Sequence, residues 1–231
     1  MAVLSKVCSF DDILPLFQNE QSIMFGGFGG IGTPSGLVDV LMKAGSRDLL
    51  LIGNDTGFPD IGIGKLVSNR RAKKLIVSHI GSNPNAGTFM SNGELEIEFS
   101  PQGTLIERIR AGGMGLGGVL CDIGLDEDIV KRDKQRVTVS GSEYLIEPAL
   151  TADIAIVYAE KADEFGNLIY DKSARNTNPL VAMAGKITVV EAKEIVSVGE
   201  LDPEAIITSG VFVDYVVQSE GVNWKWVWEP R

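Results

Sequence analysis

The sequence has 231 residues, of which 44% are hydrophobic, so it can bury the core of one domain, with or without an appended lobe. Its 31 acidic residues outnumber its 21 basic residues, and the net charge of −10 argues against a nucleic-acid partner or an anionic membrane surface. No apolar run is long enough to span a membrane and no signal peptide is visible, so we expect a cytoplasmic protein. Cys8 and Cys121 have neither metal-ligand spacing nor that of a disulfide framework, and we expect reduced thiols and no metal site.

Strands and helices alternate along the first half of the chain. We expect strands at 21–26, 48–53, 74–80 and 94–99, and helices at 34–44, 62–69 and 104–111. In the helix at 34–44, Thr33 can act as the cap, Pro34 suits the first turn and Gly45 ends the helix. The glycine-rich stretch 111–118 interrupts the alternation and predicts a mobile loop over a site or at a partner surface.

The second half continues the pattern. It predicts strands near 137–140, 153–159, 167–171, 186–191 and 211–217 and a helix at 179–184. The continuously apolar segments 154–157 and 187–190 are typical of strands that are covered on both faces. We therefore predict one α/β domain over residues 1–231, with a mostly parallel open sheet and flanking helices in a Rossmann-like layered arrangement.

A glycine-rich turn follows the first of these strands and leads directly into a helix. Such a turn lets a ligand approach the main chain, and a helix start offers unpaired N–H groups to an anion or to a developing oxyanion. The candidate substrate-binding residues are Gly26, Gly27, Phe28, Gly29, Gly30, Gly32 and Pro34.

Two other interpretations of this turn stay open. Residues 27–32 match G-x-G-x-x-G in the strand–turn–helix context of a dinucleotide site, and Asp55 lies close to where the ribose-binding acid belongs. Alternatively, a chain with 27 glycines matches this pattern by chance at a tight turn.

Two neutral amides follow two predicted strands. Asn54 comes just after the strand at 48–53, and Gln102 comes after the strand at 94–99. Both are expected at the sheet edge that carries the glycine turn, where amide N–H groups could stabilise a tetrahedral oxyanion. The structural alternative for each is backbone capping in a turn.

Other polar residues favour structural roles. His79 ends a strand with no nearby partner for a triad. Glu94, Glu96 and Glu98 alternate along one strand face and read more simply as a solvated face than as acid–base catalysts. The basic run at 70–74 is typical of a solvated helix end.

Trp224, Trp226 and Trp228 alternate near the end of the sequence. They form a large apolar area, which we expect to pack back on the body or to be covered by a partner chain.

Several motifs resemble the alpha subunits of family I CoA-transferases, the 3-oxoacid CoA-transferase group. The resemblance runs nearly end to end and departs from the N-terminal signature at Glu20. The matching segments are Asn19 with 23–28 and 32–34, together with 93–98, 100–113 and 173–184. Segments 54–59, 62–66 and 80–84 are most similar to the butyrate–acetoacetate branch.

The resemblance implies an enzyme that is active only with a beta subunit, whose glutamate attacks the acyl-CoA thioester. Asn54 and Gln102 would then line the oxyanion pocket, and the 26–34 loop would supply main-chain N–H groups. Glu94 would not be the nucleophile. The family implies short acyl-CoA and carboxylate substrates such as acetoacetate, butyrate and acetate, no cofactor beyond CoA as substrate, and a heterotetramer. A dinucleotide-dependent oxidoreductase and a non-catalytic homologue remain alternatives at this stage.

Overall fold

The computed structural model describes residues 5–131 and 134–224. Within these ranges one large sheet has the strand order β1-β12-β11-β9-β2-β3-β4-β5, and β10 pairs with β9. These strands are β1 (Val7–Cys8), β2 (Ser22–Phe25), β3 (Leu49–Ile52), β4 (Ala72–Val77), β5 (Glu96–Phe99), β9 (Ala152–Asp163), β10 (Leu168–Ile169), β11 (Gly185–Val196) and β12 (Tyr215–Gln218). Only β10 runs antiparallel to its neighbour in this sheet. The predicted mostly parallel, open α/β sheet is confirmed.

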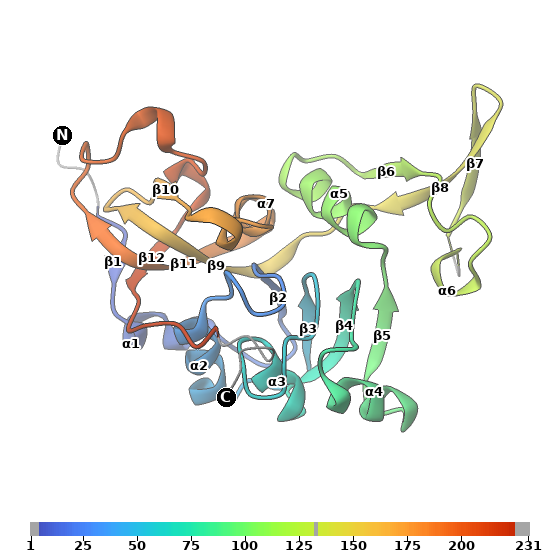
Figure 1. Ribbon diagram of the computed structural model, residues 1–231, viewed down its shortest axis with the longest axis horizontal. Coiled ribbons are helices and arrows are strands. Elements are labelled where there is room, and N and C mark those ends of the chain that lie inside the picture. Colours follow the sequence, from blue (N-terminus) through green and yellow to red (C-terminus); the bar gives the residue numbers. More distant parts are fainter. Residues whose placement is uncertain (1–4, 132–133, 225–231) are drawn as a thin grey trace.

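Helices cover both faces of the large sheet (Figure 1). On one face lie α1 (Phe10–Ile13), α2 (Ser35–Ala44), α3 (Gly64–Ser68) and α4 (Pro84–Ser91), and on the other lie α5 (Gln102–Gly113) and α7 (Asn178–Ala184). Each face has its own apolar cluster: Leu37 and Leu41 of α2 are buried in one, and Leu105 of α5 and Val181 of α7 in the other. Burial on both sides explains why β9 is apolar at consecutive positions. In the described part of the chain, no helix is long and apolar enough to cross a bilayer.

The order of the strands reverses between β2 and β9. From β2 the chain adds β3, β4 and β5 outward on one side, whereas β9, β11 and β12 lie on the other. In open parallel sheets, ligands bind beyond the carboxyl ends of the strands at such a reversal. The predicted glycine turn follows β2 at this point.

A second, smaller sheet projects from the main body (Figure 1). Its strands β6 (Gly118–Cys121), β8 (Ser142–Pro148) and β7 (Arg136–Val139) are antiparallel in the order β6-β8-β7, and α6 (Asp128–Lys131) lies between β6 and β7 in the sequence. We call residues 118–131 and 134–148 the arm. The sequence predicted a strand only at 137–140, because glycine and charged residues obscure the apolar pattern of β6 and β8.

The prediction of a loop over 111–118 is wrong at both ends. Residues 111–113 complete α5, and Gly118 begins β6. Gly112 is there because of close packing: a Cβ at this position would lie 1.9 Å from the carbonyl oxygen of Leu150. At least one glycine of this stretch is therefore explained by the close packing of α5 against its neighbours, and not by a loop.

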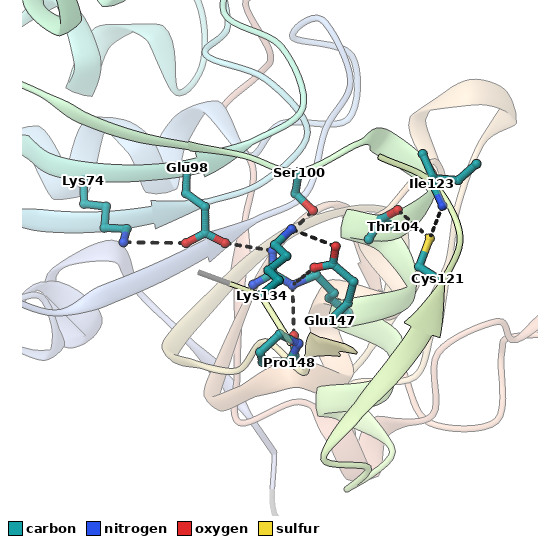
Figure 2. Close-up of polar contacts among 10 residues, drawn as sticks. Lys74, Glu98, Ser100, Thr104, Cys121, Ile123, Lys134, Glu147 and Pro148 are labelled. Carbon is teal, nitrogen blue, oxygen red and sulfur yellow. Dashed lines mark hydrogen bonds and ion pairs between the residues drawn. The ribbon is translucent and has the colours of Figure 1, made fainter. Parts of the chain in front are cut away.

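A buried cation joins the arm to the main body (Figure 2). The side chain of Arg108 on α5 is 4% exposed; it donates to the carbonyl oxygen of Pro148 at 2.9 Å and to the Glu98 carboxylate at 2.9 Å. Glu147 of β8 is fully buried, accepts a hydrogen bond from Lys134 at 2.7 Å and lies 3.8 Å from the Arg108 Nε atom. We call Arg108, Glu98, Glu147 and Lys134 the junction cluster.

The glutamates around β5 have cationic partners. Glu94 pairs with Arg70 at 2.9 Å and Glu96 with Lys74 at 2.8 Å, while Glu98 lies 3.6 Å from Lys74 on its other side. These pairs support the structural interpretation of the acidic strand over an acid–base one.

Candidate active site

The glycine loop, residues 26–34, leaves β2 at the strand-order reversal. Phe28 and Ile31 exchange main-chain hydrogen bonds of 2.9 and 3.1 Å, which form a tight turn with Phe28, 48% exposed, at its tip. Gly26 is required by close approach, since a Cβ there would lie 1.8 Å from the Asn178 side-chain oxygen. The loop therefore lies against the α7 region.

Asp55 anchors the loop from the β3 side. Its carboxylate is 5% exposed and accepts hydrogen bonds from the N–H of Gly29 at 2.7 Å, the N–H of Gly57 at 2.8 Å and the side-chain amide of Asn54 at 2.8 Å. Both carboxylate oxygens are thus engaged within the chain. The dinucleotide interpretation loses its ribose-binding acid, because Asp55 shapes the loop instead.

Two asparagines hold the loop from the other side. Asn176 accepts from the Gly27 N–H at 3.1 Å and donates to the Ile31 carbonyl at 2.9 Å. The fully buried Asn178 donates to the Gly32 carbonyl at 2.9 Å. Between them, Asp55 and these two amides fix the loop at several points. The N–H groups of Gly30 and Gly32 have no acceptor among the residues that the structure describes.

The two predicted amides do lie together. Gln102, exposed at the start of α5, donates to the side-chain oxygen of Asn54 at 2.9 Å, and the Ser78 hydroxyl donates to the same oxygen at 3.2 Å. Asn54 is 3% exposed, and its amide group donates to Asp55. Gln102 is therefore the more accessible donor of the pair, and Asn54 is placed to orient it.

The expected anion site at the start of α2 is occupied by a side chain of the protein itself. The N–H groups of Gly36 and Leu37 donate to the buried carboxylate of Glu191 on β11 at 2.7 and 3.2 Å. Burial raises the pKa of this carboxyl, and the Ser219 hydroxyl, which donates to it at 2.6 Å, opposes that rise. Pro34, rather than Thr33, occupies the N-cap position and makes no side-chain cap bond. A negative group does sit here, but it is structural.

The segment after β12 packs on the exit of the glycine loop. The Trp224 indole donates to the Thr33 carbonyl at 2.8 Å and meets the Tyr158 ring edge-on at 4.6 Å. This supports packing of the tail back on the body. Trp226 and Trp228 lie outside the described residues.

Three hollows of about 500, 510 and 500 Å³ surround Phe28. The first is lined by Phe28, Gly29, Asn54, Asp55, Ser78, His79, Ser82 and Gln102. The second is lined by Phe28, Asn54, Gln102, Gly103, Ile106, Glu107, Asn176 and Thr177. The third, which we call the arginine hollow, is lined by Phe28, Ile31, Lys172, Ser173, Arg175 and Asn176.

The chemistry of these hollows favours stabilisation of negative charge. Two carboxylates line them within the described ranges, and both have partners: Asp55 has three donors and Glu107 pairs with Arg110 at 2.8 Å. The exposed His79 follows β4 at the strand end, as predicted. The site therefore offers amide and main-chain hydrogen-bond donors, and the two carboxylates that line it are engaged within the chain.

Sequence reasoning missed the residues that shape the loop. Asp55 was considered only as a ribose ligand, and Asn176, Asn178 and Glu191 were assigned no role. The motif at 173–184 contained both asparagines and was a usable signal. Glu191 gave none, because it lies on a strand far along the chain from the helix that it caps.

Comparison with known proteins points to one family. A family model described as Coenzyme A transferase matches residues 9–219. A Bacillus subtilis (strain 168) protein named "Probable coenzyme A transferase subunit alpha" is 57% identical over 99% of this chain and 100% of its own length. The "Acetoacetyl-CoA:acetate/butyrate CoA transferase alpha subunit" of Clostridium acetobutylicum is 47% identical over 93% of this chain and 98% of its own.

Among solved structures, an acyl-CoA transferase from Escherichia coli O157:H7, in a thioester complex with CoA, matches with a TM-score of 0.84 and 23% identity. The match covers 93% of this chain and 47% of that one, so this chain spans about half the length of that polypeptide. At 23% identity, this comparison shows that the two proteins share a fold.

Proposed function

Because the chain belongs to the coenzyme A transferase family, we propose that it is the alpha subunit of an enzyme that moves CoA from a short-chain acyl-CoA or 3-oxoacyl-CoA to a carboxylate acceptor. Acetoacetate, butyrate and acetate are the proposed acids, following the name of the Clostridium relative. One observation carries the proposal: the exposed Gln102 amide is held by Asn54 beside a glycine loop at the strand-order reversal.

The proposed reaction requires a carboxylate from a beta subunit. One oxygen of the partner's glutamate attacks the thioester carbonyl, the C–S bond breaks, and an acyl-glutamyl anhydride forms as the CoA thiolate leaves. The thiolate then attacks the glutamyl carbonyl and releases the first acid, which leaves a glutamyl–CoA thioester. The acceptor carboxylate attacks this thioester, the C–S bond breaks, and a second acyl-glutamyl anhydride forms as the thiolate leaves. The thiolate then attacks the acyl carbonyl of the anhydride, which gives the new acyl-CoA and frees the glutamate.

Each attack places negative charge on a carbonyl oxygen. We assign the Gln102 amide to that oxygen, with Asn54 holding Gln102 in place and the 26–34 loop contributing main-chain N–H groups. A preorganised donor of this kind contributes about 3 kcal/mol of transition-state stabilisation. The loop residues Gly26, Gly27, Phe28, Gly29, Gly30, Gly32 and Pro34 are proposed as the substrate-binding wall.

We further propose that the whole chain acts as one alpha-subunit domain in a cytoplasmic heterotetramer of short-chain fatty acid metabolism, with CoA as a substrate and no bound cofactor. A dinucleotide-dependent oxidoreductase is not supported, because the matching family is a transferase and Asp55 is engaged within the loop. A non-catalytic homologue is likewise not supported by relatives that are named as transferase subunits.

The test is co-expression with the beta subunit, followed by assay of CoA transfer from acetoacetyl-CoA to butyrate or acetate. The assembled pair is expected to turn over, and the purified chain alone to be inert and to give no NADH fluorescence enhancement. Borohydride reduction of the covalent intermediate should modify a glutamate of the beta subunit. Transfer by the lone chain, or modification of a glutamate within it, would overturn the proposal.

A further inference from the structure

The arginine hollow holds a cation that the proposed chemistry has not used. Arg175 is exposed, and its guanidinium has no acceptor among the residues that the structure describes. Its neighbour Lys172 is different, because it pairs with Asp171 at 2.9 Å. The protein carries a net charge of −10, so an unpaired guanidinium beside the site stands out as a place for an anion.

The backbone around Arg175 is held in an uncommon conformation. Lys172 has φ 44° and Asn176 has φ 22°, both in the left-handed region that non-glycine residues rarely adopt. Asn176 connects this turn to the glycine loop through its bonds to Gly27 and Ile31. Strain that is fixed by contacts to a functional loop is typical of a site whose side chain must point one way.

The arginine hollow adjoins the rest of the site. It shares Phe28 with both other hollows, and Asn176 with the hollow that contains Gln102 and Asn54. An anionic group bound at Arg175 would therefore belong to a molecule that also reaches Gln102. Apolar contact with Phe28 and Ile31 would accompany the charge.

We propose that Arg175 binds an anionic oxygen group of the substrates, a carboxylate or a phosphate, in the arginine hollow. The inference rests on the proposed function, which supplies two molecules of that chemistry: the free acid and acyl-CoA. A guanidinium can hold either group through two parallel N–H···O bonds.

The experiment compares Arg175→Gln with the wild type in the assembled two-subunit enzyme. If the group is the carboxylate, KM for butyrate or acetate rises about tenfold or more and KM for acetoacetyl-CoA is unchanged. If the group is a phosphate, KM for acetoacetyl-CoA rises instead, whereas acetoacetyl-pantetheine, which has no phosphate, reacts equally with both enzymes. Arg175→Lys should recover part of the loss, because it keeps the charge and loses the paired geometry.

Arg47→Gln is the matched control. Arg47 is also exposed and loses the same charge, but it precedes β3 at the opposite edge of the sheet. Its KM values should stay within about twofold of the wild type, as for a surface charge far from the site. If Arg175→Gln behaves like this control, or lowers kcat alone, the inference is wrong.

A wild-type pair that transfers no CoA would overturn the proposed function without deciding the role of Arg175. Isothermal titration of the same complexes with acetoacetate and with acetoacetyl-CoA decides it in that case. Weaker binding of one ligand by Arg175→Gln supports the inference, and equal affinities for both overturn it.

Discussion

The cluster around the glycine loop and the junction cluster satisfy their buried polar side chains in different ways. Both lie where strands of the large sheet end, and both bury polar side chains. The junction cluster uses formal charges: Arg108 and Lys134 surround the buried Glu147, and Arg108 also pairs with Glu98. The loop cluster uses neutral amides and main-chain N–H groups around a single carboxylate, Asp55.

The two clusters differ in whether they leave a hydrogen-bond donor free for another molecule. At the junction, the Arg108 guanidinium is committed to Pro148 of the arm and to Glu98 and Ser100 of the main body, the three partners labelled in Figure 2. At the loop, Asn54 and Asn176 are held through both their oxygen and their NH2 group, whereas Gln102 is held through its NH2 group alone and still faces a hollow. A cluster of neutral donors can therefore remain rigid and yet leave a hydrogen-bond donor for a substrate.

The largest expected effect is at the junction. Arg108→Met leaves Glu98 and the fully buried Glu147 without their shared cation, which should lower the free energy of unfolding by about 3–5 kcal/mol. Urea unfolding measures the loss. Arg110→Met is the control, because Arg110 lies on the same helix, is 39% exposed and pairs with Glu107 on the surface; it should cost about 0.5 kcal/mol. Equal losses would mean that the junction charges do not hold the arm.

The next effect concerns the donor pair. In the assembled enzyme, Gln102→Ala should lower turnover by about two orders of magnitude with unfolding unchanged, because it removes one preorganised donor. Asn54→Ala should produce a loss of similar size, acting through Gln102. If Asn54 only positions Gln102, the double variant should be about as slow as Gln102→Ala alone. Fully additive losses would instead show that Asn54 donates to the substrate by itself.

A third test compares two buried carboxylates. Glu191, unlike Glu147, is held by N–H and hydroxyl donors. Glu191→Ala leaves two N–H groups of α2 without an acceptor and should cost about 2 kcal/mol, whereas Glu191→Gln keeps an acceptor and should cost less than about 1 kcal/mol.

The same residue predicts a pH dependence. Burial raises the folded-state pKa of Glu191 above 4.5, so the folded state binds this proton more tightly than the unfolded chain does. Its contribution to stability should therefore fall as the pH rises from about 4.5 through the folded pKa, and Glu191→Gln should remove that fall. Unfolding curves at several pH values measure it, and an unchanged profile in the variant would contradict the assignment.

The smallest effect is expected at a half-exposed pair. The hydrogen bond from Lys186, with those from Ser22, lowers the pKa of Asp153 to about 2, and the side chain is 38% exposed. Asp153→Asn should cost about 1 kcal/mol at neutral pH, less than the shift alone implies because solvent screens the pair. The cost should be present above pH 3.8 and vanish as the pH falls through 2. A cost that is the same at pH 2 and pH 7 would contradict the ionic origin.

Much of the fold was accessible from the sequence. The strands of the large sheet that pair near the switch point, β2, β3, β9 and β11, are apolar runs that local patterns identify. The helix α4 and the strand β8 were missed. The first has 8 residues, most of them small or polar, so it shows little apolar periodicity, although Asn83 caps it. The second, β8, is stabilised by pairing with β6 and β7 and by the junction cluster, and local sequence patterns do not show these contacts.

The sequence predicted the two amides of the site, but not the residues whose roles depend on contacts between distant segments. Asn54 and Gln102 were found because each follows a strand at one edge of the sheet, and topology brings such positions together. The charge on Asp55 suggested a ligand, but its use in fixing Gly29 depends on loop geometry. Glu191 at the start of α2 could not be anticipated, because no local pattern connects a strand residue with a helix 155 positions earlier.

The bonds that shape the glycine loop span very different lengths of chain: 26 residues to Asp55, 149 to Asn176, and 191 from the Thr33 carbonyl to Trp224. During synthesis the loop leaves the ribosome well before Asn176 and Trp224, which are two of the side chains that hold it. A truncated or unfinished polypeptide would contain the loop's residues without its shape. The loop can therefore reach its observed shape only after synthesis has passed Asn176 and Trp224.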